Sequence, residues 1–276
     1  MNVNVMNYWR LIRPVSTLSG TLAVLLGGYV AGTGAWGRIG WAMVVTLFVS
    51  GSANAWNDAM DMEIDQINQP KRMVAVGLIP RRHAIWFSVG LGVLAVILSV
   101  WLGWGAWLMT TGSVLILYLY SWRLKSTVLI GNGVVATVSA MSALFGGLAA
   151  GDMRPAAWLA LVIWVSIMSR EILKTLADYE GDLRFECRTV ATVWGRVVAR
   201  RLFYLFWVLA MGAMLVPYGV GLFGAGYLGV VLVLVWPLLV LVGRGAWQEE
   251  DGLRLEYWSQ VMKYGFFVWF VAVVVG

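Results

Sequence analysis

Long apolar runs, bounded by charged or turn-forming residues, recur along the whole chain. Each run is about as long as the ~20 residues that an α-helix needs to cross a bilayer. Nine such runs occur, near residues 15–31, 39–56, 84–102, 104–121, 128–150, 156–176, 198–217, 221–243 and 258–275. Open strands are excluded because they would leave backbone groups unpaired in lipid. The pattern therefore predicts an all-α polytopic membrane protein with nine transmembrane helices.

The composition supports a membrane protein and limits what else the chain can hold. Of its 276 residues, 61% are hydrophobic and only 12% are charged, whereas roughly a quarter of the residues of a soluble domain are charged. Nine spans leave no room for a soluble catalytic domain or a nucleic-acid-binding domain. We expect a single transmembrane domain over residues 1–276, with the lipid bilayer as its surroundings. The sequence indicates no nucleic acid and no obligatory protein partner.

The charged residues predict an orientation. If the N-terminus is cytoplasmic, all of the 20 Lys and Arg residues except Arg38 and Arg154 fall in cytoplasmic segments, as the positive-inside rule requires. All of the 14 Asp and Glu residues except Asp152 fall there too, which the rule does not demand. We therefore expect a multi-pass protein of the cell membrane, with its chemistry on the cytoplasmic side.

Two polar ladders follow the second and sixth runs. Their members are spaced by four: Asn57, Asp61 and Asp65 in the first ladder, and Asp178, Asp182 and Glu186 in the second. On a helix, this spacing places each ladder on one face. The constant offset between the ladders predicts two parallel four-helix repeats, about 10–125 and 126–243, and a ninth helix at 258–275. Such repeats would let the ladders face each other across a central cavity.

The ladders predict a hard metal ion. Like charges four residues apart destabilise a helix, and ionisable groups near a bilayer are costly, so a compensating cation is needed. Oxygen ligands without His or Cys suit Mg²⁺, which often bridges carboxylates to phosphates. Basic residues close to the ladders fit a diphosphate: Lys71, Arg72, Arg123, Lys125, Arg170 and Lys174. Simpler interpretations are solvated helix ends for the acids and positive-inside anchors for the basic residues.

At these residues the chain resembles the UbiA superfamily of intramembrane prenyltransferases, over essentially its full length. The first signature of that family, Asn-x-x-x-Asp-x-x-x-Asp, is matched by Asn57, Asp61 and Asp65. The second, Asp-x-x-x-Asp, is matched by Asp178 and Asp182. The resemblance implies nine helices around a central cavity that opens sideways to lipid. It also implies that these five residues bind Mg²⁺ together with a prenyl diphosphate.

Four stretches are most similar to enzymes that make the second prenyl transfer of archaeal ether-lipid synthesis: Asn57–Asn68, Tyr118–Asn132, Phe145–Ala149 and Arg170–Asp182. This similarity implies geranylgeranyl diphosphate as donor and geranylgeranylglyceryl phosphate as acceptor. Relatives that prenylate aromatic acceptors, such as 4-hydroxybenzoate, naphthoates or chlorophyllides, share the motifs and remain an alternative. One departure lies after Arg72, where relatives usually have Pro-Ile-Pro-Ser-Gly and this chain has Met73–Gly77.

The residues predict an electrophilic reaction. Asp61 and Asp182 are predicted to be catalytic as well as metal-binding, and Arg72, Lys125 and Lys174 would contact phosphate oxygens. An allylic cation needs aromatic faces, for which Tyr118, Tyr120 and Trp122 are candidates; Tyr120 and Lys125 are counted with the catalytic group. A carboxylate or the departing diphosphate would take the proton of the acceptor.

A transporter is the main alternative outside the enzymes, because it too would have repeats and a central site. The acids lie at helix ends and not through the depth of the bilayer, which disfavours an ion relay. Two other features are given structural interpretations. Gly146 and Gly147 are expected to permit a close helix approach, and the acidic segment Glu249–Asp251 is expected to be a solvated loop.

Overall fold

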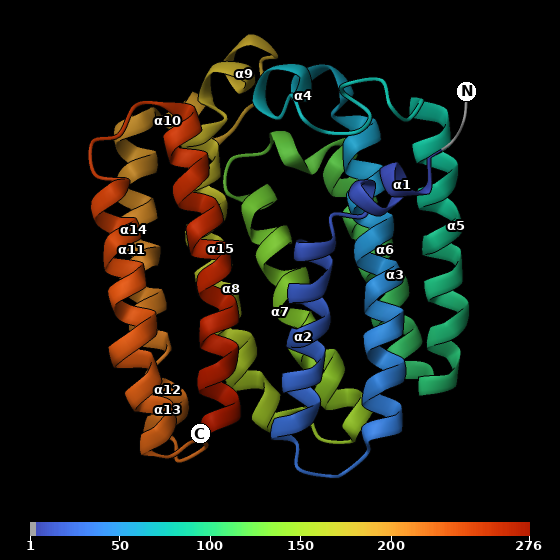
Figure 1. The fold of residues 1–276 in the computed structure, drawn as a ribbon, viewed down its shortest axis with the longest axis vertical. Helices are drawn as coiled ribbons and strands as arrows, with labels where there is room; N and C mark the ends of the chain where they lie inside the picture. The colour runs from blue at the N-terminus through green and yellow to red at the C-terminus, as the bar shows by residue number, and fades with distance from the viewer. Residues whose placement is uncertain (1–3) are drawn as a thin grey trace. The chain divides into compact units, whose positions relative to one another are not determined.

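The computed structural model describes residues 4–276, and the regular structure of this part of the chain is entirely helical (Figure 1). Residues 1–3 of the predicted domain lie outside the described residues. The chain forms two compact units, Met1–Lys125 with Leu144–Met153, and Ser126–Ala143 with Arg154–Gly276. Helix α7, Ile130–Ala150, is divided between them. The sequence repeats predicted above stay a prediction.

The first unit is built around the helix that carries the first ladder. Its helices are α1 Val5–Leu11, α2 Pro14–Val30, α3 Trp36–Met60, α4 Met62–Asn68, α5 Arg81–Ser99 and α6 Trp104–Trp122, with short 3₁₀ turns at Val100–Leu102 and Leu124–Ser126. Helix α3 packs against α2, α5 and α6. Small residues such as Ala42, Ala95 and Ala106 fill the core between them, which lets the helices approach closely.

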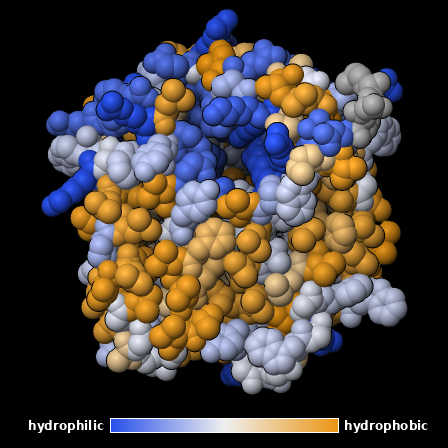
Figure 2. Space-filling model, viewed as in Figure 1, coloured by the Kyte–Doolittle hydropathy of each residue, from blue (hydrophilic) through white to orange (hydrophobic). Residues whose placement is uncertain are grey.

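The second unit is built around the helix that precedes the second ladder. Its helices are α8 Arg154–Ala177, α9 Tyr179–Arg184, α10 Val190–Trp194, α11 Arg196–Ala213, α12 Val216–Gly219, α13 Ala225–Val230, α14 Trp236–Gly245 and α15 Gly252–Val275, with a π-helical turn at Val231–Val235. Helix α8 packs against α11 and α15. Apolar side chains cover α11 and α14, and hydrophilic side chains gather at the end of this unit near α10 (Figure 2).

All nine predicted runs fold as helices, but the predicted number of spans is slightly too high. Among residues 4–276, seven helices are long and apolar enough to cross a membrane, and the bent pair α1–α2 would make eight. Helix α6 is not among them, because Trp104, Trp107 and Thr110 dilute its aliphatic residues. The chain is nevertheless a multi-pass membrane protein.

The bend between α1 and α2 points a basic residue towards α3. The two helices meet at 55°, with Arg13 in the left-handed region at φ 52° and Pro14 as the first residue of α2. The Ile12 carbonyl, released by the bend, accepts hydrogen bonds from Asn54 Nδ2 at 2.8 Å and Thr17 Oγ1 at 2.7 Å. These bonds hold the bend against α3.

Candidate active site

The first ladder keeps its helical spacing through a break in the helix. Asp61 lies between α3 and α4 with φ −91° and ψ 11°, yet the amide of Asp61 still bonds to the Asn57 carbonyl and that of Asp65 to the Asp61 carbonyl. Asn57 Nδ2 also donates to Asp61 Oδ2 at 2.6 Å. The three side chains therefore lie on successive turns, as predicted.

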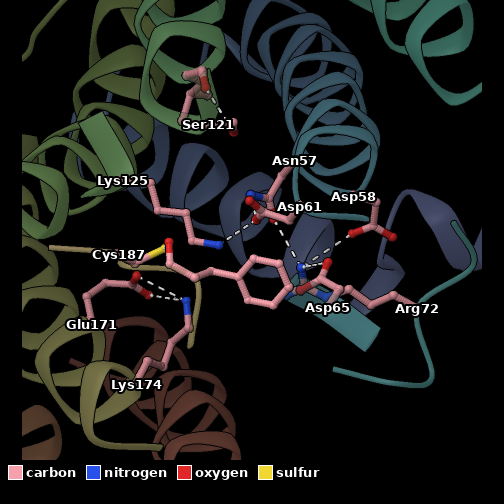
Figure 3. Close-up of polar contacts among 12 residues, drawn as sticks. Asn57, Asp58, Asp61, Asp65, Arg72, Ser121, Lys125, Glu171, Lys174 and Cys187 are labelled. Atoms are coloured by element: carbon pink, nitrogen blue, oxygen red, sulfur yellow. Dashed lines mark hydrogen bonds and ion pairs between the residues drawn. The ribbon is translucent and has the colours of Figure 1, made fainter. Parts of the chain in front are cut away.

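Arg72 links the acids of this ladder. Its guanidinium lies 2.5 Å from Asp65 Oδ2, 3.7 Å from Asp58 Oδ1 and 3.4 Å from Asn57 Oδ1 (Figure 3). Burial opposes the charge of Arg72, but Asp65, Asp58 and Asp61 outweigh it and raise its pKa. Burial raises the pKa of Asp65 to about 6, against the lowering influence of Arg72. Asp65 is thus a carboxylate that a further cation would help to ionise.

The loop that carries Arg72 is anchored by apolar side chains. Met73, Val74 and Ile79 are buried in one cluster with Leu11 and Ala55. The prolines that relatives usually have here would restrict the backbone directly. In this chain, burial of aliphatic side chains holds the loop instead. The departure after Arg72 is therefore compatible with a well-placed guanidinium.

Two more basic residues hold the first ladder. Lys125, in the turn after α6, donates to Asp61 Oδ2 at 2.7 Å (Figure 3); burial disfavours its charge, but Asp61 outweighs this effect and raises its pKa. Arg13 Nη2 donates to Asn57 Oδ1 at 3.0 Å and pairs with Asp58. Arg13 was not among the predicted site residues, because its contact depends on the bend before α2. Its position directly before Pro14 is the only sequence signal for that bend.

The other basic and aromatic candidates of the first unit differ in their surroundings. Lys71 is exposed, and the exposed Arg123 lies 4.6 Å from the ring of Trp122, which is itself 64% exposed. Tyr120 is half-buried near the end of α6. Of these residues, Tyr120 alone is partly buried, and it lies five residues before Lys125.

Tyr118 belongs to a polar cluster between three helices. Its hydroxyl is hydrogen-bonded at 2.8 Å to both Ser52 of α3 and Ser88 of α5. Its ring stacks on Trp56 with centroids 4.3 Å apart, and Trp56 Nε1 donates to the Tyr118 carbonyl. These contacts join the end of α6 to α3 at Trp56, the residue directly before Asn57. They explain how Lys125 comes to lie beside Asp61.

The second motif also lies at a helix break. Asp178 separates α8 from α9, with φ −86° and ψ 6°, and the buried Asp182 follows one turn later. Asp61 and Asp65 occupy the same places around their own break. The structural counterpart of Asp178 is therefore Asp61, and not Asn57 as the sequence offset indicated. Glu186 lies beyond the end of α9 and is exposed, so it does not continue the ladder.

A buried acid that the sequence analysis did not single out lies two turns before Asp178. Glu171 is only 5% exposed, and its carboxylate pairs with Lys174 Nζ at 3.1 Å (Figure 3). It also pairs with Arg170 Nη1 at 3.3 Å. Arg170 Nε also donates to the Ser259 carbonyl of α15. Glu171 thus fixes two predicted phosphate-binding residues. A buried acid within an apolar span is the signal that could have identified it.

The donor set fits a hard divalent ion, although no cluster is preassembled. Among residues 4–276, no group of three or more His, Cys, Asp or Glu side chains is arranged to hold a metal. The Arg72 guanidinium instead contacts three side-chain oxygen atoms around the first motif. These oxygens therefore already surround one positive charge. Mg²⁺ prefers such oxygen ligands and keeps several of its waters, so two or three protein oxygens are enough to bind it.

The chain is similar to known proteins over most of its length. Residues 18–271 match the model of the UbiA prenyltransferase family. A relative from Methanopyrus kandleri named digeranylgeranylglyceryl phosphate synthase is 35% identical over 90% of this chain and 93% of its own. A protein of the same name from Methanothermobacter thermautotrophicus is 30% identical over 98% and 95% of the two chains.

Solved structures share the fold. One reported for digeranylgeranylglyceryl phosphate synthase in membranes has a TM-score of 0.76 and 26% identity, over 99% of this chain and 98% of its own. A UbiA homologue from Archaeoglobus fulgidus bound to GPP and Mg²⁺ has a TM-score of 0.72 and 17% identity, over 98% and 100%. The helical architecture is thus that of the UbiA fold.

Proposed function

Because the chain belongs to the UbiA prenyltransferase family, we propose that it transfers a geranylgeranyl group from geranylgeranyl diphosphate to geranylgeranylglyceryl phosphate in ether-lipid synthesis. The observation that carries the choice of acceptor is the similarity to relatives named digeranylgeranylglyceryl phosphate synthase, which extends over 90% and 98% of this chain in two of them. The motif residues support the chemistry.

Mg²⁺ is the proposed cofactor. We assign Asn57, Asp61 and Asp65 to one ion and Asp178 and Asp182 to another, because all five offer oxygen atoms at a helix break or one turn from it. When bound, Mg²⁺ supplies positive charge to the diphosphate oxygens while the allylic carbon–oxygen bond breaks. The bound Mg²⁺ of the Archaeoglobus fulgidus homologue is consistent with this assignment.

The basic residues of the chain are proposed to change partners when the donor binds. Without substrate, Arg72 and Lys125 hold Asp65 and Asp61, and Lys174 holds Glu171. With the donor bound, these groups donate to phosphate oxygens. Hydrogen bonds between charged groups are about twice as strong as neutral ones. The negative charge that develops on the diphosphate is thereby stabilised as it forms.

The reaction breaks the bond between C1 of the donor and the diphosphate and forms a bond from the acceptor hydroxyl oxygen to C1. The hydroxyl proton passes to a carboxylate or to the departing diphosphate. Among the aromatic candidates, the ring of Tyr118 is stacked on that of Trp56, and the Arg123 guanidinium lies over the ring of Trp122. Tyr120 is therefore our choice for the group that faces the allylic cation.

We place the reaction on the cytoplasmic side of the cell membrane. Both motifs lie at or beyond the C-terminal ends of long apolar helices, α3 and α8. The basic residues beside them belong to the segments in which nearly all Lys and Arg residues occur, and such segments are retained in the cytoplasm.

An acceptor panel tests the proposed function. Purified protein is given radiolabelled geranylgeranyl diphosphate with geranylgeranylglyceryl phosphate, 4-hydroxybenzoate or a naphthoate, each with and without Mg²⁺. We expect label to enter the glyceryl phosphate lipid alone, and only when Mg²⁺ is present. Preferential labelling of an aromatic acceptor would overturn the choice of acceptor. Transfer that is unaffected by chelation of divalent ions would overturn the metal assignment.

A further inference from the structure

The acidic segment that the sequence analysis expected to be solvated is held firmly by two arginines. Arg196 donates to the Glu250 carbonyl at 2.7 Å and pairs with its carboxylate at 2.9 Å. Arg200, one turn later on α11, donates to the Glu249 carbonyl at 2.7 Å and pairs with Glu250 at 2.9 Å. The segment is a loop with an exposed Glu250 side chain, as expected, but the arginines bind its backbone as well as its side chains.

The segment also makes hydrogen bonds within itself. Glu249 Oε1 accepts hydrogen bonds from the amides of Glu250 and Asp251, at 3.0 Å each. Asp251 Oδ1 accepts from the amide of Arg254 at 3.0 Å and so caps the N-terminus of α15. We call the segment Trp247–Gly252 the brace loop. Its conformation is fixed at both ends, by the arginines of α11 and by the start of α15.

The brace loop and its arginine contact both residues that flank Asp178. The Arg196 guanidinium lies 5.1 Å from the ring centroid of Tyr179, directly after Asp178. Gly252 lies against the backbone of Ala177, directly before Asp178. A Cβ atom on Gly252 would be only 2.6 Å from the Ala177 carbonyl oxygen. No larger residue fits there without moving α8 or α15.

These contacts lie on either side of Asp178, which is outside both α8 and α9. The amides of Asp178 and Asp182 keep their bonds to the Lys174 and Asp178 carbonyls, so the break keeps its helical spacing, and the groups packed against residues 177 and 179 help to set its position. Groups that bind a reacting substrate must be held to within about 0.5 Å. We propose that the brace loop and Arg196 hold the α8–α9 break and thereby place Asp178 and Asp182 for diphosphate binding. The inference rests on the proposed function, and Arg196 and Gly252 are positioning residues.

At the first motif, Arg72 and Lys125 reach carboxylates directly. At the second motif, the Arg196 guanidinium lies over the ring of the neighbouring Tyr179, and Gly252 lies against the backbone of Ala177. These two contacts act on the position of the break and need no contact with substrate.

Hydrogen–deuterium exchange tests the brace without relying on activity. The test variants are Arg196→Met and Gly252→Ala. The controls are Arg254→Met, whose side chain is 75% exposed and makes only a 3.5 Å pair with Glu249, and Gly212→Ala on α11, which has no atom within 4 Å of an added Cβ. We expect amide exchange in residues 178–184 to rise in both test variants and in neither control, while residues 57–68 keep the wild-type rate.

The activity assay follows on the same variants. A 1 Å misplacement of a binding group costs up to about 100-fold in rate, so we expect the Mg²⁺ concentration for half-maximal transfer to rise about tenfold or more. Arg196→Lys, which retains the charge, should restore most of the loss. Wild-type exchange at 178–184 in both test variants would contradict the proposed positioning role of the brace loop and Arg196. An unchanged Mg²⁺ requirement in folded Arg196→Met would contradict it too. If the wild-type protein shows no transfer, the proposed function fails, and the exchange result still decides the brace.

Discussion

Replacing Lys125 by methionine removes a single charge from the first motif while keeping most of the side-chain volume. The ammonium lies 2.7 Å from Asp61, whose side chain is 8% exposed, and is itself 26% exposed. In the proposed reaction, Lys125 passes from this carboxylate to a phosphate oxygen of the donor. The variant therefore loses one charged hydrogen bond to the group whose negative charge grows as the reaction proceeds.

The size of the effect follows from that one bond. A hydrogen bond to a charged group contributes about 1.5–3 kcal/mol, and partial access of water to Lys125 favours the lower half of this range. At 1.36 kcal/mol for each factor of ten, kcat/KM for the donor should fall about 10- to 50-fold. Because Asp61 is then relieved of a competing cation, the Mg²⁺ concentration for half-maximal activity should not rise.

The assay is steady-state transfer of radiolabelled donor, with Mg²⁺ and donor varied separately and thermal unfolding in detergent as a check on folding. Lys125→Arg should recover most of the loss, because it keeps the charge. Arg81→Met serves as the control, since it removes only the exposed pair with Glu63 at 3.2 Å and should leave the rates unchanged. A folded Lys125→Met protein with wild-type kcat/KM would refute the role of this residue.

Three further outcomes are expected. Asp61→Asn and Asp182→Asn should each lower turnover by more than about 100-fold in protein that remains folded, as measured by label transfer and thermal unfolding; near-normal turnover in both would contradict the metal assignment. Gly146→Ala places a Cβ 1.9 Å from the Val24 carbonyl oxygen and should destabilise the protein by about 1–3 kcal/mol. Gly133→Ala on the same helix, where no atom lies within 4 Å, should stay within about 1 kcal/mol; equal unfolding midpoints would rule out the close helix approach. Tyr118→Phe should lower the free energy of unfolding by about 0.5–1.5 kcal/mol, because the hydrogen bonds to two serines are lost, and should leave turnover nearly intact. Loss of turnover without loss of stability would instead assign the Tyr118 hydroxyl to the chemistry.

The helices and the first motif could be predicted from the sequence because they depend on local spacing. Apolar runs of spanning length fold as helices wherever they occur, and the spacing of Asn57, Asp61 and Asp65 survives the break at Asp61. The number of spans was less secure, since α6 lies near the limit that separates a span from a buried helix.

What could not be predicted depends on contacts between distant segments. Arg13 reaches Asn57 because α1 bends away from α2. The register of the second motif follows from a helix break that residue spacing alone does not locate. The role of the brace loop depends on two arginines some fifty residues earlier in the chain. Each of these features required the folded backbone.

The central claim is that the two acidic motifs hold divalent ions on a prenyl diphosphate. Its most direct test is anomalous diffraction from crystals grown with Mn²⁺ and a non-reactive thio analogue of geranylgeranyl diphosphate. We expect manganese peaks about 2.1–2.2 Å from carboxylate oxygens of Asp61 or Asp65 and of Asp178 or Asp182, with the diphosphate bound to the same ions. Manganese bound away from these carboxylates, or a diphosphate bound with no metal beside it, would contradict the proposed metal sites.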